Sequence, residues 1–259
     1  MMRALWTAAS GMRSQQTNVD TISNNLANVN TTGYKTERTE FKSLLYQTLQ
    51  AETTTANGED KPVSAQVGLG TRVASINSIF TEGELITSES DTDFAIDGDG
   101  FFGIVGADGN TYYTRNGSFV WAIGNKGTTL TTSYGNPVLD SDGKQIILPD
   151  GVSAGQVQVS NHGELGYLNG DGEYVDMEQT IGLWQFNNPS GLEKMSNSML
   201  AVTEASGNAM NEATTDGLQV SGIKQGYLEG SNVQVADEMV NLIVAQRAYE
   251  LNSKAIQAA

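Results

Sequence analysis

The stretch SNNLANVNTTGYK, residues Ser23–Lys35, separates a helical N-terminal segment from a turn-rich remainder. Upstream, apolar residues recur at steps of three and four, which is the period of an amphipathic helix with near-heptad spacing. The stripe consists of Leu5, Ala8, Met12, Val19, Ile22, Leu26 and Val29. The turn-forming run NTTG at 30–33 predicts that this helix ends at about Asn28.

A second long helix is predicted at the C-terminus. Ser231 and Asn232 are candidate N-cap residues, and Asp237 and Glu238 follow early, where carboxylates favour the helix dipole. One apolar stripe holds Val235, Met239, Leu242, Tyr249 and Ile256, and another holds Ala236, Val240, Ile243, Val244, Ala248, Leu251 and Ala255. Together they form a face wider than one partner helix can cover, which predicts contacts with other subunits. The pattern leaves open a monomeric hairpin of the two helices.

The middle of the chain is predicted to be all-β and antiparallel, forming an irregular sandwich or barrel. The expected strand runs are Phe94–Ile96, Phe101–Val105, Tyr112–Thr114, Ser118–Ile123, Ile146–Leu148, Val157–Val159, Ile181–Phe186 and Leu218–Val220. Turn signals separate them, among them Asn116-Gly117, a strong two-residue hairpin signal. The fold class is therefore α+β, with long terminal helices that pair as a coiled-coil-like stalk and an all-β middle domain.

Four segments are expected along the chain. Residues 1–30 form the N-terminal helix and 231–259 the C-terminal helix that pairs with it. Residues 31–75 form a linking region, and 76–230 form the outer β domain. Within the linking region we expect a short amphipathic helix with Phe41, Leu44, Leu45 and Leu49, followed by a Thr-rich loop, Ala51–Gln66.

Charge is distributed unevenly over the 259 residues, whose formal net charge is −16. Residues 1–50 carry +2 and 231–259 carry −1, so the middle carries −17. This pattern indicates buried ends and an exposed middle, and the acidic total argues against a nucleic-acid partner. No apolar run is long enough to predict membrane insertion, and no cleavable signal peptide is visible.

Candidate catalytic and metal-binding groups are few. Cysteine is absent, and the single histidine, His162, lies in the turn-like Asn161-His162-Gly163. The acids of DTDFAIDGDG, at 91, 93, 97 and 99, suggest a calcium site, but their spacing differs from an EF-hand loop. Gly98-Asp99-Gly100 precedes no helix and is therefore no dinucleotide fingerprint. We expect no enzyme, metal or cofactor.

Four segments together resemble the rod–hook axial protein family of bacterial flagella. They are LWTAASGM with QQTNVDTISNNLANVNTTGYK (5–12 and 15–35), DFAIDGDGFF (93–102), YYTRNGSF (112–119) and GYLEGSNVQVADEMVNLIVAQRAYELNSKAI (226–256). The chain length, Leu44–Gln47 and the Thr-rich segment before Gly68 resemble the distal-rod members most. A proximal rod or hook subunit is the alternative. Members of the family usually continue the C-terminal helix beyond Ala259 by several turns.

The resemblance implies a structural subunit that polymerises into a stiff hollow drive shaft, which transmits torque and lines an export channel. It implies self-association, proximal rod and hook proteins, envelope ring proteins and the type III export apparatus as partners, with an uncleaved N-terminal signal. The expected location is the basal-body rod crossing the cell envelope. The expected subunit contacts are Leu5, Met12, Val19, Ile22, Asn24, Asn25, Leu26, Asn28, Val29, Val235, Met239, Val240, Leu242, Ile243, Arg247, Tyr249, Leu251 and Ile256.

Two other functions remain to be weighed. A soluble adhesive or binding oligomer with a closed helical stalk would also use apolar ends. A cell-wall glycan hydrolase would need paired carboxylates in a cleft, and the sequence offers no way to choose the pair. The asparagines at 24, 25 and 28 fit either local caps or intersubunit bonds.

Overall fold

The computed structural model describes residues 2–50, 65–124, 127–149, 151–169, 173–215 and 217–258. The chain divides into two units. We call Met1–Ala27, Glu37–Ser78 and Gln234–Ala259 the helical unit, and Asn28–Thr36 with Ile79–Val233 the β unit. The α+β class predicted from the sequence is confirmed, with one long helix at each end and a β-rich middle.

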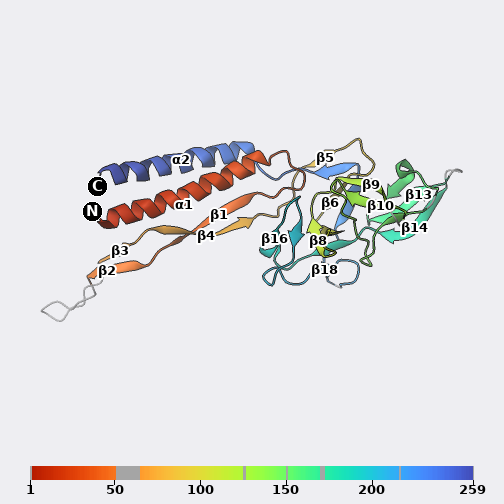
Figure 1. Ribbon diagram of the computed structural model, residues 1–259, viewed down its shortest axis with the longest axis horizontal. Coiled ribbons are helices and arrows are strands. Elements are labelled where there is room, and N and C mark those ends of the chain that lie inside the picture. Colours follow the sequence, from red (N-terminus) through yellow and green to blue (C-terminus); the bar gives the residue numbers. More distant parts are fainter. Residues whose placement is uncertain are drawn as a thin grey trace. The chain divides into compact units, whose positions relative to one another are not determined.

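The helical unit is built on two antiparallel helices that lie side by side, α1 (Met2–Ala27) and α2 (Val235–Ala258) (Figure 1). Two contacts define their register. Gly11 lies so close to Asn252 that an added Cβ would come within 2.9 Å of its amide nitrogen. Nearer the other end of the pair, the Asn25 amide donates a hydrogen bond to the Glu238 carboxylate at 3.3 Å. The missing side chain of Gly11 thus leaves room for the Asn252 side chain against the α1 backbone.

The helix ends agree with the sequence on one side only. Helix α1 ends at Ala27, as the NTTG run predicts. Helix α2 begins at Val235, so the N-cap prediction at Ser231 and Asn232 is wrong. Within the β unit, the Asn232 side chain instead accepts hydrogen bonds from Thr36 and donates one to the Ile79 carbonyl. The Asn232 side chain therefore forms long-range hydrogen bonds and does not cap α2.

The described residues of the helical unit also form two antiparallel β-pairs: β1 (Glu37–Ser43) with β4 (Thr71–Ser78), and β2 (Tyr46–Gln50) with β3 (Ala65–Gly68). The short helix expected around Phe41–Leu49 is therefore wrong. Backbone pairing with strands that lie further along the chain satisfies these peptide groups, and the local apolar spacing does not reveal that pairing. Of the expected Thr-rich loop, residues 51–64 lie outside the described residues, and residues 65 and 66 begin β3.

Hydrogen bonds between the β1–β4 pair and α1 hold the strands against the helix. Buried Thr39 donates its hydroxyl to the hydroxyl of buried Thr21 at 3.0 Å. At the start of β4, the Thr71 N–H donates to the Ser10 hydroxyl at 3.3 Å. Gly70 has a φ of +115° and passes so close to Ser10 that a side chain there would collide with it. Helix α1 therefore packs against α2 on one side and against the strand pair on another.

Where the structure describes it, the β unit contains short strands and two 3₁₀ turns. The strands are β5 (Leu85–Thr87), β6 (Phe94–Asp97), β7 (Phe101–Val105), β8 (Thr111–Thr114), β9 (Phe119–Gly124), β10 (Gly127–Thr132), β11 (Ile147–Leu148), β12 (Val157–Val159), β13 (Glu164–Leu168), β14 (Tyr174–Thr180), β15 (Leu183–Gln185), β16 (Glu193–Lys194), β17 (Leu200–Ala201), β18 (Met210–Asn211), β19 (Gly222–Gln225) and β20 (Tyr227–Glu229); the turns are η1 (Ala154–Gln156) and η2 (Pro189–Gly191). All pairs among the described strands are antiparallel.

These strands form several small open sheets rather than a barrel. The largest has the order β16-β17-β8-β7-β15-β18, and two three-stranded sheets have the orders β11-β10-β9 and β12-β13-β14. Strands β19 and β6 pair, as do β20 and β5. No described sheet closes on itself, so of the two predicted arrangements the barrel is wrong.

Neighbouring residues of β7 divide the interior of the β unit into two apolar clusters. Phe101 and Phe102 are both fully buried, and successive side chains of a strand point to opposite faces. Phe102 packs edge-to-face on Phe119, with ring centroids 5.1 Å apart. Phe101 belongs to the other cluster, where the rings of Tyr113 and Phe186 lie 4.9 Å apart. A strand covered on both faces thus forms the centre of this unit.

Most strand predictions match the structure, and two turn or strand assignments do not. The expected strand Leu218–Val220 is wrong, because the strand is β19 at Gly222–Gln225, where it pairs with β6. The Asn116-Gly117 hairpin is also wrong, since it connects β8 and β9, which lie in different sheets. The Asn116 side chain accepts a hydrogen bond from the Ser118 N–H at 3.0 Å, so it stabilises a local turn. His162 does lie in a turn, between β12 and β13.

Candidate assembly surfaces

The outer face of α2 is a broad apolar surface. The exposed apolar residues are Val235, Met239, Val240, Ile243, Val244, Tyr249 and Leu251. Their exposed fractions reach 59% at Ile243 and 67% at Leu251, while Ala245 is the helix's only buried residue among those described. Residues 239–246, MVNLIVAQ, carry no charge. We call the side formed by Met239, Val240, Ile243 and Val244 the outer α2 face.

The remaining expected contact residues of α2 have other surroundings. Leu242 and Ile256 are half-buried, and they share the helical face of Asn252 and Glu238, which contact α1. Arg247 is exposed and donates a hydrogen bond to the Glu250 carboxylate at 2.9 Å. The two stripes read from the sequence therefore separate: part of one packs within the chain, and most of the other is exposed.

The expected contact residues of α1 also differ in burial: some are half-buried and others are buried within the chain. Leu5, Met12, Val19 and Leu26 recur every seven residues, and all four are half-buried. Ile22 is 5% exposed and belongs to the interior of the helical unit. Asn28 and Val29 follow the end of α1 and are half-buried in the β unit.

The three asparagines of the opening stretch differ in role. Asn25 is completely buried, and its side chain bonds to the backbone of Glu37 through both its oxygen and its nitrogen. The Asn28 carboxamide oxygen accepts a hydrogen bond from the Thr31 hydroxyl at 3.1 Å, within the turn that follows α1. Asn24 is exposed. For Asn25 and Asn28, the bonds seen here lie within the chain.

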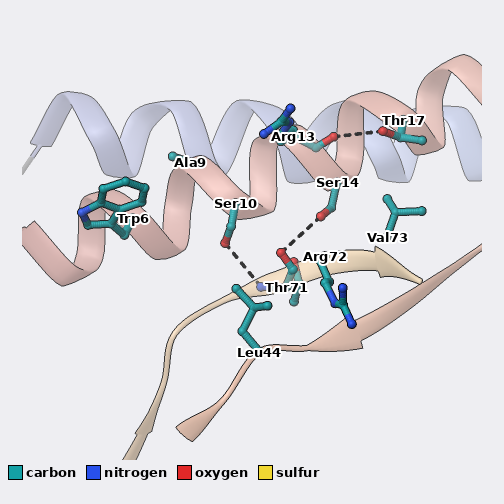
Figure 2. Close-up of a pocket in the computed structure, with 10 residues that line it drawn as sticks. All are labelled: Trp6, Ala9, Ser10, Arg13, Ser14, Thr17, Leu44, Thr71, Arg72 and Val73. Carbon is teal, nitrogen blue, oxygen red and sulfur yellow. Dashed lines mark hydrogen bonds between the residues drawn. The ribbon is translucent and has the colours of Figure 1, made fainter. Parts of the chain in front are cut away.

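A groove runs along α1 beside the strand pair (Figure 2). Its volume is about 490 Å³. It is lined by Trp6, Ala9, Ser10, Arg13, Ser14, Thr17, Leu44, Thr71, Arg72 and Val73. The hydroxyls of Ser10 and Ser14 both bond to the backbone of Thr71, as the dashed lines in the figure show. These ten residues are four apolar ones, four serines or threonines and two arginines, and none of them is acidic.

A buried cluster of charges lies in the β unit beside residues 28–36. The Glu229 carboxylate, 1% exposed, forms ion pairs with Lys35 and with Arg115, whose guanidinium lies 3.4 Å away. The same carboxylate accepts a hydrogen bond from the Gly83 N–H at 3.0 Å. Lys35 also donates to the Thr81 carbonyl at 2.7 Å. One acid thus holds two cations and joins segments that are distant in the sequence.

Burial shifts the pKa values of the two cations in this cluster, Lys35 and Arg115. Desolvation lowers the pKa of the Lys35 ammonium, and the Glu229 carboxylate opposes this by favouring the charged form. Desolvation also lowers the pKa of the Arg115 guanidinium, again opposed by Glu229. The guanidinium lies 4.9 Å from the centroid of the Phe101 ring, where a cation is attracted to the π-face.

Residues 31–35 join this cluster through the backbone as well. Gly33 has a φ of +69°, and its N–H donates to the Glu229 carbonyl at 2.8 Å. A Cβ at this position would lie 2.7 Å from the backbone of Arg115 and Asn116. The sequence indicated the turn at Gly33, but not its partners. Arg115 and Glu229 lie in the quoted motifs YYTRNGSF and GYLEGSN, yet nothing in the spacing pairs them with Lys35.

Two of the candidate metal-binding acids, Asp93 and Asp97, make contacts within the chain. Asp93 accepts a hydrogen bond from the Ser88 hydroxyl, and Asp97 forms an ion pair with Lys224 at 2.5 Å. That hydrogen bond to Asp97 raises the pKa of the Lys224 ammonium. Among the described residues, no group of three or more potential ligands could hold a metal ion. Neither of the described helices is long and apolar enough to cross a membrane.

Three family models match separate parts of the chain. The flagellar basal body rod protein model matches residues 5–35, the flagellar hook protein FlgE/F/G D1 domain matches 95–167, and the flagellar basal body rod FlgEFG protein C-terminal model matches 224–259. They cover α1 with the turn that follows it, the central part of the β unit, and α2.

Relatives align over almost the whole chain. The flagellar basal-body rod protein FlgG of Borreliella burgdorferi is 44% identical over 260 residues, covering 99% of this chain and 94% of the relative. The protein of that name from Buchnera aphidicola subsp. Schizaphis graminum is 39% identical, covering 99% and 95%. That from Agrobacterium fabrum is also 39% identical, covering 100% and 95%. The chain belongs to the flagellar basal-body rod protein family and is a structural rod subunit of the bacterial flagellum.

Proposed function

We propose that this subunit polymerises through its terminal helices into the distal part of the rod. The polymer is a stiff hollow shaft that transmits torque to the hook and encloses an export channel. In this proposal, proximal rod and hook proteins flank the polymer, and envelope rings surround it. The subunit reaches the rod through the flagellar type III export apparatus.

The outer α2 face is the observation that carries this proposal. Met239, Val240, Ile243 and Val244 are 55 to 62% exposed and lie within an uncharged span of eight residues. A monomeric soluble protein rarely exposes a contiguous apolar surface of this kind, and such surfaces mark interaction sites. Burial in a neighbouring subunit would contribute about 1.5–3 kcal/mol for each large side chain that is fully covered.

The contact residues proposed from the sequence are refined by their burial. On α2 we assign subunit contacts to Val235, Met239, Val240, Ile243 and Leu251, which are exposed. On α1 the half-buried heptad stripe at 5, 12, 19 and 26 can contribute the rest of each side chain to a neighbour. Ile22 and Asn25 instead act within the subunit, where they are already buried.

Replacing Ile243 with Asp tests the proposal. Loss of the Ile contact by about 2 kcal/mol would raise the critical concentration for polymerisation roughly 30-fold, and burying the carboxylate would raise it further. Asn241→Asp is the matched control, because it adds the same charge two residues away at an exposed polar position. Sedimentation and electron microscopy of the purified protein measure the polymer. A closed oligomer from the unmodified chain, or equal polymerisation of Ile243→Asp and Asn241→Asp, would contradict the proposal.

A further inference from the structure

Charge is sorted along the length of the helical unit. Contacts between its two helices fix a common axis: Gly11 of α1 lies beside Asn252 of α2, and Asn25 lies beside Glu238. The hydrogen bonds from β1 and β4 to α1 place the strand pair along the same axis (Figure 1). Each charged residue described in this unit therefore belongs to one half of its length or to the other.

One half contains the start of α1, the end of α2 and the strand residues next to Thr71. Its described cations are all exposed: Arg3, Arg13, Lys42, Arg72, Arg247 and Lys254. The one acid described in this half, Glu250, pairs with Arg247, whose guanidinium lies 2.9 Å from the carboxylate. We call this half the cationic end.

The other half contains the end of α1, the start of α2 and the strand residues next to Thr39. Arg38 is the one cation described there, and the described acids are Asp20, Glu37, Glu40, Asp237 and Glu238. The helix dipole favours Asp237 and Glu238 in the first turn of α2, but it does not account for the other three acids. We call this half the acidic end.

The sign of the charge changes along a single side of α1. Arg13 and Asp20 are both exposed and are seven residues apart, which places them on the same side of the helix, about 10 Å apart along its axis. A second copy that is displaced along this axis can therefore bring its Arg13 toward Asp20 of the first copy without a rotation.

A second copy of this chain is the partner that matches both ends. When two copies point in the same direction and are displaced along the axis, the cationic end of one faces the acidic end of the other. Without the displacement, like charges lie together. An antiparallel pair also matches unlike ends, but its two-fold symmetry closes the contact as a dimer. The proposed shaft needs an open contact, because different proteins flank it at its two ends.

We propose that the cationic end of one subunit lies against the acidic end of the next subunit along the polymer axis, so that opposite charges set the direction in which subunits stack. This contact rests on the proposed polymerisation and gives it a polarity. The outer α2 face contributes apolar attraction, which is non-directional, and the charges restrict the axial position of each neighbour.

Ionic strength tests the contact on the unmodified protein. Raising NaCl from about 0.1 M to about 1 M shortens the Debye length from about 10 Å to about 3 Å, which screens the attraction between exposed charges. We expect the critical concentration for polymerisation to rise at least ~5-fold, measured by sedimentation. A critical concentration that stays constant or falls would overturn the contact, because screening does not weaken apolar burial.

Two variants each reverse the charges of one end. The first replaces three exposed cations: Arg3→Glu, Arg13→Glu and Lys254→Glu. The second replaces three exposed acids: Asp20→Lys, Glu40→Lys and Asp237→Lys. Like charges then predominate at both ends of each variant. Each variant alone should therefore raise the critical concentration at least ~10-fold.

Mixing the two variants restores opposite charges wherever a copy of one meets a copy of the other. We expect the equimolar mixture to polymerise at a critical concentration within ~3-fold of the unmodified protein. The matched control replaces three exposed acids of the β unit, Glu84→Lys, Glu89→Lys and Glu193→Lys, and should stay within ~3-fold on its own. Circular dichroism compares the helix content of all variants.

The outcomes separate this contact from the function on which it rests. Either variant polymerising alone as well as the unmodified protein overturns the contact and leaves the proposed function standing. A mixture that stays as defective as its components, with unchanged helix content, does the same, and so does a mixture that stops at discrete dimers. If a variant loses helix content, the ionic-strength series on the unmodified protein decides. Failure of the unmodified protein to polymerise overturns both.

Discussion

Asn25 and Glu37 are joined by two hydrogen bonds that resemble one rung of a β-ladder. The Asn25 side-chain oxygen accepts from the Glu37 N–H at 2.9 Å, and its nitrogen donates to the Glu37 carbonyl at 2.8 Å. The last turns of α1 are thereby attached to the first residue of β1. The same amide nitrogen also reaches Glu238 of α2, so one buried side chain connects three elements of the helical unit.

Replacing Asn25 with Ala should destabilise the helical unit by about 1–3 kcal/mol, since it removes two partners from partly buried backbone groups. Asn25→Asp should cost at least as much, because a carboxylate cannot donate to the Glu37 carbonyl and lies near the Glu238 carboxylate. Urea unfolding followed by circular dichroism measures both. Ser23→Ala, at an exposed position of the same helix, is the control and should change the free energy of unfolding by less than about 0.5 kcal/mol. Equal stability of Asn25→Ala and Ser23→Ala would refute a stabilising role for the hydrogen bonds between Asn25 and Glu37.

Replacing Glu229 with Gln should destabilise the β unit by about 3–5 kcal/mol. The isosteric amide leaves the buried cations of Lys35 and Arg115 without their anion, and an uncompensated buried charge is costly. Glu84→Gln is the control, because this residue is exposed and loses only a solvated charge. Thermal unfolding of both variants checks the difference. A loss below about 1 kcal/mol for Glu229→Gln would show that the cluster contributes little.

Gly33→Ala should destabilise the chain more than Gly109→Ala, although both glycines have a positive φ. At Gly109, φ is +80° and an added Cβ would meet nothing within 4 Å, so the cost is backbone strain of about 1–2 kcal/mol. At Gly33 the Cβ would also lie 2.7 Å from the Arg115 backbone, which adds a steric cost. Chemical denaturation of the two variants gives the difference. Equal losses of stability would mean that the backbone of residues 28–36 shifts to accommodate the added Cβ without a further free-energy cost.

Tyr113 should make the protein less stable at alkaline pH. Burial raises the pKa of its phenol above the ordinary value of 10.0. Between pH 10.0 and that raised pKa, the unfolded chain has lost the proton that the folded chain retains, so the free energy of unfolding falls as the pH rises. The Lys35 ammonium, whose pKa is lowered, contributes in the opposite sense over its own window below 10.5.

A comparison with Tyr113→Phe isolates the tyrosine, because the Lys35 contribution is the same in both proteins. We expect the decline in stability above pH 10 to be shallower in the variant, measured by denaturant unfolding at a series of pH values. Parallel curves for the two proteins would mean that the phenol ionises alike in both states.

Some features could be read from the residues alone because they are local and periodic. The heptad recurrence of Leu5, Met12 and Val19 predicted α1, and the NTTG run predicted its end. The alternation of short apolar runs with turn residues predicted the antiparallel strands. The two apolar stripes of α2 predicted that one side of this helix would need a partner outside the chain.

Other features depended on contacts between residues far apart in the sequence, and only the tertiary structure decided them. Residues 37–50 carry helix-like apolar spacing but are strands, because β4 and β3 supply their backbone partners. Asn232 resembles a helix cap but bonds to Thr36 and Ile79. In the stretch SNNLANVNTTGYK, the turn was local and therefore predictable. The role of its last residue was not, because Lys35 is buried against Glu229, 194 positions away, and such pairing leaves no periodic signal in either segment.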